Sequence, residues 1–109
     1  MPLWEHDMAE LYKRLGTTTA TAAANVFDNG NTANTYTVIS SIVICNTGAA
    51  AYTYYISTSA SSATHGAYIA SNATVAAYDT VVLVAGICLD PTNRYLVAHA
   101  NNGAVNITA

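Results

Sequence analysis

The side chains best suited to metal binding in this sequence are three histidines, His6, His65 and His99. They fall in a predicted helix, a predicted loop and a predicted strand, and no two of them have the short spacing that is typical of a metal site. We therefore expect no metal and no cofactor within one chain. One His99 from each subunit around a three-fold axis could still coordinate an ion, but a polar strand residue is the simpler interpretation.

The cysteines and the central aspartates have structural explanations. Cys45 and Cys88 each lie in an apolar run typical of a strand, where a buried free thiol behaves as a small hydrophobic residue. One disulfide between the sheets is the alternative. Asp28, Asp79 and Asp90 each adjoin a turn or the start of a strand. An aspartate there accepts hydrogen bonds from the nearby backbone, which explains these residues without acid–base catalysis.

No catalytic motif is present. The sequence has no GxSxG, no glycine-rich phosphate loop and no Ser/His/Asp arrangement with supporting context. The serines within residues 57–62 are typical of a loop. We therefore predict that the protein is not an enzyme.

Charge is the unusual feature of the composition. Nine of the 109 residues are charged, and residues 29–78 contain no Asp, Glu, Lys or Arg. Soluble domains average about 25% charged residues, so this block predicts a surface in permanent contact with protein. Hydration by Thr, Ser, Asn and Tyr is the alternative. Without a Lys/Arg cluster or a long apolar run, we expect no nucleic-acid partner, no signal peptide and no membrane span.

Residues 2–15 have the pattern of a short amphipathic helix, with apolar residues at helical spacing and charges mostly on the other side. Gly16 supplies the C-terminal stop. A helix of this length is marginal in water by itself, so it must dock on its own domain or on a neighbouring subunit. The apolar stripe, a candidate partner-binding surface, consists of Trp4, Met8, Leu11 and Leu15.

The stretch Tyr36–Gly48 is predicted to be the central strand of an all-β domain, because it is rich in β-branched residues and ends in an Asn-Thr-Gly turn signal. Ser40 and Ser41 in its middle indicate a slip in the alternation or a bulge. Other predicted strands cover residues 26–27, 51–58, 66–70, 80–89, 94–100 and 104–108. About seven short strands predict an antiparallel β-sandwich with immunoglobulin-like or jelly-roll architecture. Residues 1–25 form the helix and an extended Thr/Ala arm, and residues 26–109 form the sandwich domain.

Tyrosine dominates the aromatic residues, with eight Tyr against one Phe and one Trp. A tyrosine combines a large apolar face with a polar end, which suits subunit interfaces and also carbohydrate stacking. The candidate binding tyrosines are Tyr52, Tyr54 and Tyr55. We favour subunit contacts, with a carbohydrate-binding surface as the alternative.

Three stretches of the chain carry a resemblance. They are Tyr12-Lys13-Arg14-Leu15-Gly16 with the Thr/Ala arm, then Tyr36-Thr37-Val38 leading into Ser41-Ile42-Val43-Ile44-Cys45-Asn46-Thr47-Gly48, and last Tyr68-Ile69-Ala70 through Asp79-Thr80-Val81-Val82-Leu83 to Gly86-Ile87-Cys88-Leu89. Together they resemble a family of small virion structural proteins of tailed bacteriophages. The likeness covers about residues 12–109 and rests on structural motifs, with no catalytic residues. Residues 1–11 look like an extension, and Thr32-Ala33-Asn34-Thr35 stands where a Pro-Ala-Gly-type turn is expected.

The resemblance implies a structural component of the virion, assembled in the host cytoplasm. We expect a capsid decoration or cement protein that binds outside the shell as a homo-oligomer, with a trimer favoured. Its partners would be the major capsid protein or other virion subunits, and residues 1–25 would be the arm and anchor. A neck or tail-fibre component, including an adhesin, is one alternative, and a carbohydrate-binding module is another.

Overall fold

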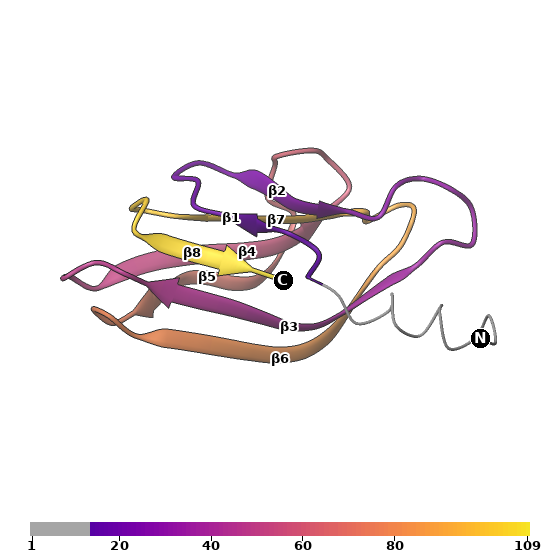
Figure 1. Ribbon diagram of the computed structural model, residues 1–109. Coiled ribbons are helices and arrows are strands. Elements are labelled where there is room, and N and C mark those ends of the chain that lie inside the picture. The colour runs from indigo at the N-terminus through magenta and orange to yellow at the C-terminus, as the bar shows by residue number, and fades with distance from the viewer. Residues whose placement is uncertain (1–13) are drawn as a thin grey trace, which may run out of the picture.

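The computed structural model describes residues 14–109, apart from the side chains of Val84 and Ala85, and all regular structure in this range is β-strand (Figure 1). The strands are β1 (Thr17–Thr18), β2 (Ala24–Asp28), β3 (Thr37–Asn46), β4 (Tyr52–Ser59), β5 (Ala67–Val75), β6 (Thr80–Leu89), β7 (Tyr95–Ala100) and β8 (Val105–Thr108).

The strands form two antiparallel sheets of four strands each. Sheet A has the order β1-β8-β3-β6 and sheet B the order β2-β7-β4-β5. The pairing is nested, because β1 pairs with β8, β2 with β7, β3 with β6, and β4 with β5. Contacts of β3 with β8 and of β4 with β7 complete the two sheets. The prediction of an antiparallel β-sandwich is therefore confirmed.

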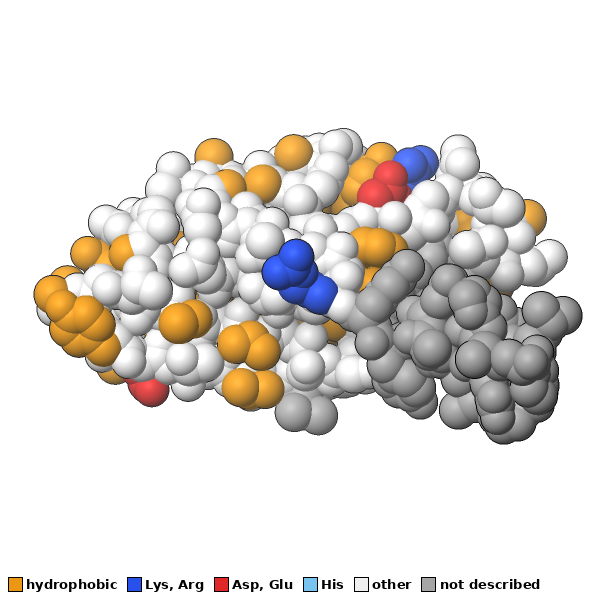
Figure 2. Space-filling view, in the orientation of Figure 1, with side chains coloured by type: hydrophobic (Ala, Val, Ile, Leu, Met, Phe, Trp, Pro, Cys, Tyr) orange, Lys and Arg blue, Asp and Glu red, His pale blue; other side chains and the backbone are white. Residues whose placement is uncertain are grey.

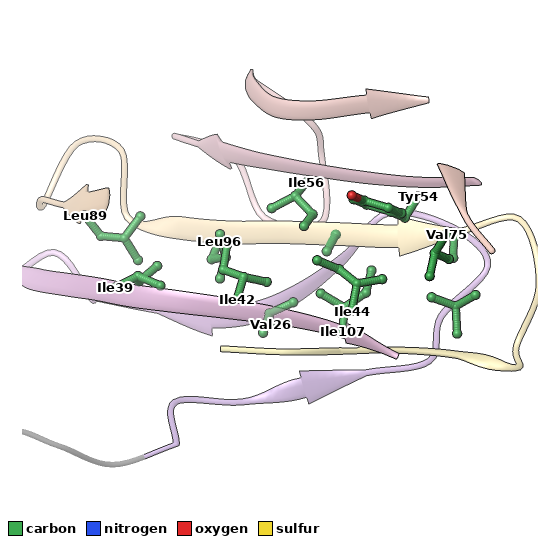
Figure 3. Close-up of a cluster of buried hydrophobic side chains, with 13 residues drawn as sticks. Val26, Ile39, Ile42, Ile44, Tyr54, Ile56, Val75, Leu89, Leu96 and Ile107 are labelled. Atoms are coloured by element: carbon green, nitrogen blue, oxygen red, sulfur yellow. The ribbon is translucent and has the colours of Figure 1, made fainter. Parts of the chain in front are cut away.

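The core lies between the sheets, where alternate residues of each strand point inward (Figure 3). Sheet A contributes Ile39, Ile42 and Ile44 of β3, and sheet B contributes Ile56 and Leu96. The predicted slip at the serines of β3 is confirmed as a register shift between Ile39 and Ser41. The extra residue of this bulge lies on β6, where Gly86 has a φ of +57° that glycine adopts without strain.

Strand β5 is longer than predicted. The sequence predicted a strand over residues 66–70 only, but β5 runs on to Val75 through a register shift opposite Tyr55. Asn72 has a φ of +51° at this point. Asparagine tolerates this conformation better than most residues, so the turn-forming residue produces a bulge within the strand.

The predicted N-terminal helix lies outside the described residues except for its last two, Arg14 and Leu15, which are not helical. The N–H of Leu15 donates to the carbonyl of Ala109 at 2.8 Å, and the Leu15 side chain packs against the core. Of residues 17–25, predicted as an arm, residues 17–18 form β1 and residues 24–25 begin β2, so both ends belong to the sheets, while residues 19–23 connect them through a bend.

Asn46 is the polar residue that joins the end of β3 to both neighbouring connections. Its side chain is buried, with 1% of its surface exposed. Its Nδ2 donates to the carbonyls of Ala50, at 2.7 Å, and Ala76, at 3.0 Å, while its Oδ1 accepts from the N–H of Gly48 at 2.9 Å. These bonds hold the β3–β4 turn against the β5–β6 connection, and so fix one end of the sandwich.

Replacing Asn46 with leucine tests this role, because leucine has a similar size but no polar group. We expect Asn46→Leu to lower the free energy of unfolding by about 1–3 kcal/mol, since part-buried backbone groups lose their partner. The control is Thr47→Val, because Thr47 is exposed and donates one hydrogen bond to Ala104; its cost should stay below about 1 kcal/mol. Urea unfolding followed by circular dichroism measures both, and equal losses would contradict the assignment.

Candidate functional site

The structure brings His65 and His99 together, although they are 34 residues apart in sequence. His65 lies in the β4–β5 connection, which consists of residues 60–66, and His99 lies in β7. Tyr55 of β4 is directly opposite His99 in the register of sheet B, and Ser57 is the next residue on the same face. We call Tyr55, Ser57, His65, Tyr68 and His99 the histidine cluster; it lies on the outer face of sheet B.

Hydrogen bonds and stacked rings connect the histidine cluster. Ser57 Oγ lies 2.6 Å from His65 Nδ1, and His65 Nε2 lies 2.7 Å from His99 Nδ1. The ring of Tyr55 stacks on His99 with a centroid distance of 4.6 Å and an angle of 5° between the planes. Tyr68 stacks on His65 with a centroid distance of 5.0 Å. Both ring nitrogens of His65 and Nδ1 of His99 thus have their hydrogen-bond partners inside the cluster.

The surroundings of both histidines favour the neutral form. Burial lowers the pKa of His65 below its ordinary value, and the charge that His99 would carry lowers it further. Burial also lowers the pKa of His99. Burial has this effect because a cation loses hydration when it leaves water.

The cluster has the order of a nucleophile, a base and a second imidazole that orients the base. Ser57, however, is fully buried, and its Oγ also accepts from the N–H of Gly66 at 3.3 Å. A nucleophile must be reached by its substrate, so Ser57 cannot attack one in this arrangement. Among residues 14–109, no group of three or more His, Cys, Asp and Glu could hold a metal ion. The geometry therefore supports a hydrogen-bonded structural cluster.

The aspartates act as turn residues, as predicted from the sequence. Asp28 accepts from the N–H of Gly30, and Asp90 accepts from the N–H groups of Thr92 and Asn93. Asp28 also forms a two-bond ion pair with Arg94, both bonds being 2.8 Å long. The hydrogen bond from Arg94 is the main reason that the pKa of Asp28 is lowered to about 2, and this pair ties β2 to the start of β7.

The two cysteines are free, so they do not form the disulfide left open by the sequence. The prediction that both thiols are buried is wrong for Cys88, which is exposed. Cys88 lies opposite Val38 in the register, and Val38 points away from the core. Cys88 therefore lies on the outer face of sheet A, where its thiol is exposed.

The outer face of sheet A is a second candidate site. Val38 lies opposite Cys88, and Val43 lies opposite Val82. The side chains of Val38 and Val82 are 64% and 55% exposed. We call the surface formed by Val38, Val43, Cys45, Val82 and Cys88 the neutral face. Figure 2 shows that charged side chains are sparse on the visible side of the molecule.

Of the candidate partner-binding residues, the four that the structure describes do not form one exposed surface. Tyr54 is 4% exposed in the core, Tyr52 packs against the core, and Tyr55 belongs to the histidine cluster. Leu15 packs on the core, while Trp4, Met8 and Leu11 lie outside the described residues. The large exposed tyrosines are instead Tyr36, Tyr68 and Tyr78.

In comparisons with known proteins, the chain matches no protein-family model, no curated protein and no solved structure. In the described part of the chain there is no helix with the length and apolar character needed to cross a membrane.

The lowered histidine pKa values predict how stability depends on pH. Above the ordinary pKa of 6.5 the stabilisation is complete, because both the folded and the unfolded chains are neutral at these positions. As the pH falls through the lowered values, the unfolded chain binds protons first, so the free energy of unfolding decreases. Asp28 contributes a separate loss below its ordinary pKa of 3.8, towards about 2.

Urea unfolding at a series of pH values between about 7.5 and 4.5 measures this dependence, with the fall expected below the ordinary histidine pKa. His99→Asn should flatten the curve in this range, because one titrating group is removed. Stability that rises on acidification would contradict the sign of both shifts.

Proposed function

We propose that this protein is a non-enzymatic structural subunit of a tailed-phage virion, namely a capsid decoration or cement protein. It binds outside the shell as a homo-oligomer, with a trimer favoured, and it contacts the major capsid protein or other virion subunits. The observation that carries this proposal is the neutral face of sheet A, together with the resemblance in sequence.

The neutral face has the composition expected of a surface that another protein covers. Exposed valines such as Val38 and Val82 gain from removal from water. Burying an isolated charge is costly, and the centres of protein interfaces are depleted in charged residues. The named residues of this face carry no charge that would oppose such burial.

We further infer that the sandwich is a double-sheet jelly roll, the second of the two architectures considered. The nested pairs β1–β8, β2–β7, β3–β6 and β4–β5 are those obtained by rolling up one long antiparallel hairpin. Jelly rolls occur in viral capsid domains and in lectins. A fold does not determine a function, so this architecture is compatible with both the virion and the carbohydrate-binding interpretations.

The carbohydrate-binding alternative has less support. It requires exposed aromatic rings side by side, but Tyr54 lies in the core and Tyr52 packs against it. A neck or tail location within the virion agrees with the neutral face equally well, and differs from a shell location in copy number. A shell protein would be present in many copies per particle, whereas a neck or tail component forms one or a few rings.

The first test places a charge on the neutral face. Quantitative mass spectrometry of purified particles should find the wild-type protein in many copies and the Val82→Lys variant reduced by about tenfold or more, since one buried unpaired charge costs well over 1.4 kcal/mol. Thr64→Lys is the control, because Thr64 is exposed in the connection over sheet B. Absence of the wild-type protein from particles would end the virion proposal, and normal incorporation of Val82→Lys would exclude the neutral face as the contact.

The second test concerns the anchor, for which we propose Trp4, Met8 and Leu11. Deletion of residues 2–13 removes this stripe but retains Leu15, whose backbone bonds to Ala109. We expect the truncated protein to keep its urea midpoint within error and to be lost from particles. Full incorporation of the truncated protein would show that these residues are not an anchor.

A further inference from the structure

The β4–β5 connection folds back over the outer face of sheet B. Figure 1 shows this connection rising from β4 and β5 to the level of β2. Asn25 of β2 holds its tip, because Asn25 Nδ2 donates to Ser62 Oγ and Asn25 Oδ1 accepts from the N–H of Ala63, both at 2.8 Å. Strand β2 is two positions from β4 in the sheet, so the connection spans about 10 Å of sheet surface.

Two side chains on the outer face are covered as a result. Ser57 and Val97 lie opposite each other in the register and are fully buried. Val97 alternates with the core residues Leu96 and Ala98, so it points away from the core. The burial of both side chains must therefore come from the connection and the rings beside it.

The closed connection is under local constraint. Ala63 has a φ of +49°, a conformation that costs a non-glycine residue free energy and persists only where neighbours hold it. Gly66 leaves no room for a side chain, since a Cβ there would lie 2.6 Å from the carbonyl oxygen of Thr58. The connection therefore stays closed only while its hydrogen bonds at both ends are intact.

We propose that His65 and His99 form a proton-sensitive latch, in which the neutral pair holds the β4–β5 connection closed over sheet B and protonation of both imidazoles releases it.

The latch depends on protons because each imidazole changes its number of hydrogen-bond donors and acceptors when it is protonated. A neutral imidazole has one donor and one acceptor, so the chain from Ser57 through His65 to His99 is satisfied when both rings are neutral. One added proton can still be accommodated, because a charged His65 donates from both of its nitrogens. When both rings are charged, His65 Nε2 and His99 Nδ1 are both donors facing each other at 2.7 Å, and the bond is lost.

Within residues 14–109, no carboxylate lies close enough to the pair to balance these charges. The titratable side chains that contact the pair are Tyr55 from β4 and Tyr68 from β5, and both present ring faces. Asn25 of β2 is neutral and is bonded to the connection. Just before β7, Arg94 is paired with Asp28 and lies over the ring of Tyr95. No carboxylate contributes to the lowered pKa of either histidine, and this agrees with release on acidification.

Amide hydrogen exchange of the full-length chain, measured by NMR and corrected for intrinsic rates, tests the latch. The reporters are the N–H groups of Ala63, bonded to Asn25, and Gly66, bonded to Ser57. As the pH falls from about 7.5 through the titration of both rings, their protection should fall by about tenfold or more, since one pH unit below a pKa changes the proton balance tenfold. Protection of Ile44, in the centre of sheet A, should not change.

His99→Asn should remain protected at the lower pH, because an amide oxygen can replace Nδ1 as acceptor and does not titrate. His6→Asn removes the third histidine and should respond as the wild type does. The proposal is overturned by constant protection of Ala63 and Gly66, by a parallel loss at Ile44, by a wild-type response in His99→Asn, or by a lost response in His6→Asn.

The ring protons of His65 and His99 in the wild-type protein give a second measurement that does not depend on the folding of a variant. They should titrate below 6.5, the ordinary histidine pKa, and the signals of Ala63 and Gly66 should shift at the same midpoint. Different midpoints for the rings and the connection would contradict a latch.

Discussion

A sandwich of two sheets has two outer faces that water or another part of a protein must cover. Because residues 29–78 contain no charged side chain, both faces depend largely on neutral groups. The protein treats the two faces differently. Sheet B is covered by its own β4–β5 connection, which Asn25 and the histidine cluster hold in place. Sheet A leaves Val38 and Val82 open on the neutral face. This asymmetry is the basis of our functional interpretation.

The two outer faces therefore have different roles. On sheet B, burial lowers the pKa of His65 and of His99. Ser57 is fully buried, and its bond to His65 and the bond of His65 to His99 connect the β4–β5 connection to the sheet. On sheet A, apolar side chains in an uncharged surrounding favour contact with another protein. Asn46 stabilises the end of the sandwich that carries both faces, because its side chain bonds the β3–β4 turn and the β5–β6 connection together.

The sequence predicted those features that depend on local pattern. The β-branched run of β3 and the aspartate turns could be recognised because alternation and turn chemistry act between near neighbours. The continuation of β5 past Asn72 was missed because sheet pairing overrode a turn signal. Tyr54 points inward because of the way β4 is placed in sheet B, and His65 meets His99 because the β4–β5 connection folds back over the sheet. A single sequence carries no signal for either of these arrangements.

A cryo-EM reconstruction of the intact particle tests whether another protein covers the neutral face of sheet A. We predict that a neighbouring subunit lies against Val38 and Val82 while the β4–β5 connection of sheet B remains unoccupied by a partner. Density in which Val38 and Val82 face solvent in every copy would contradict it.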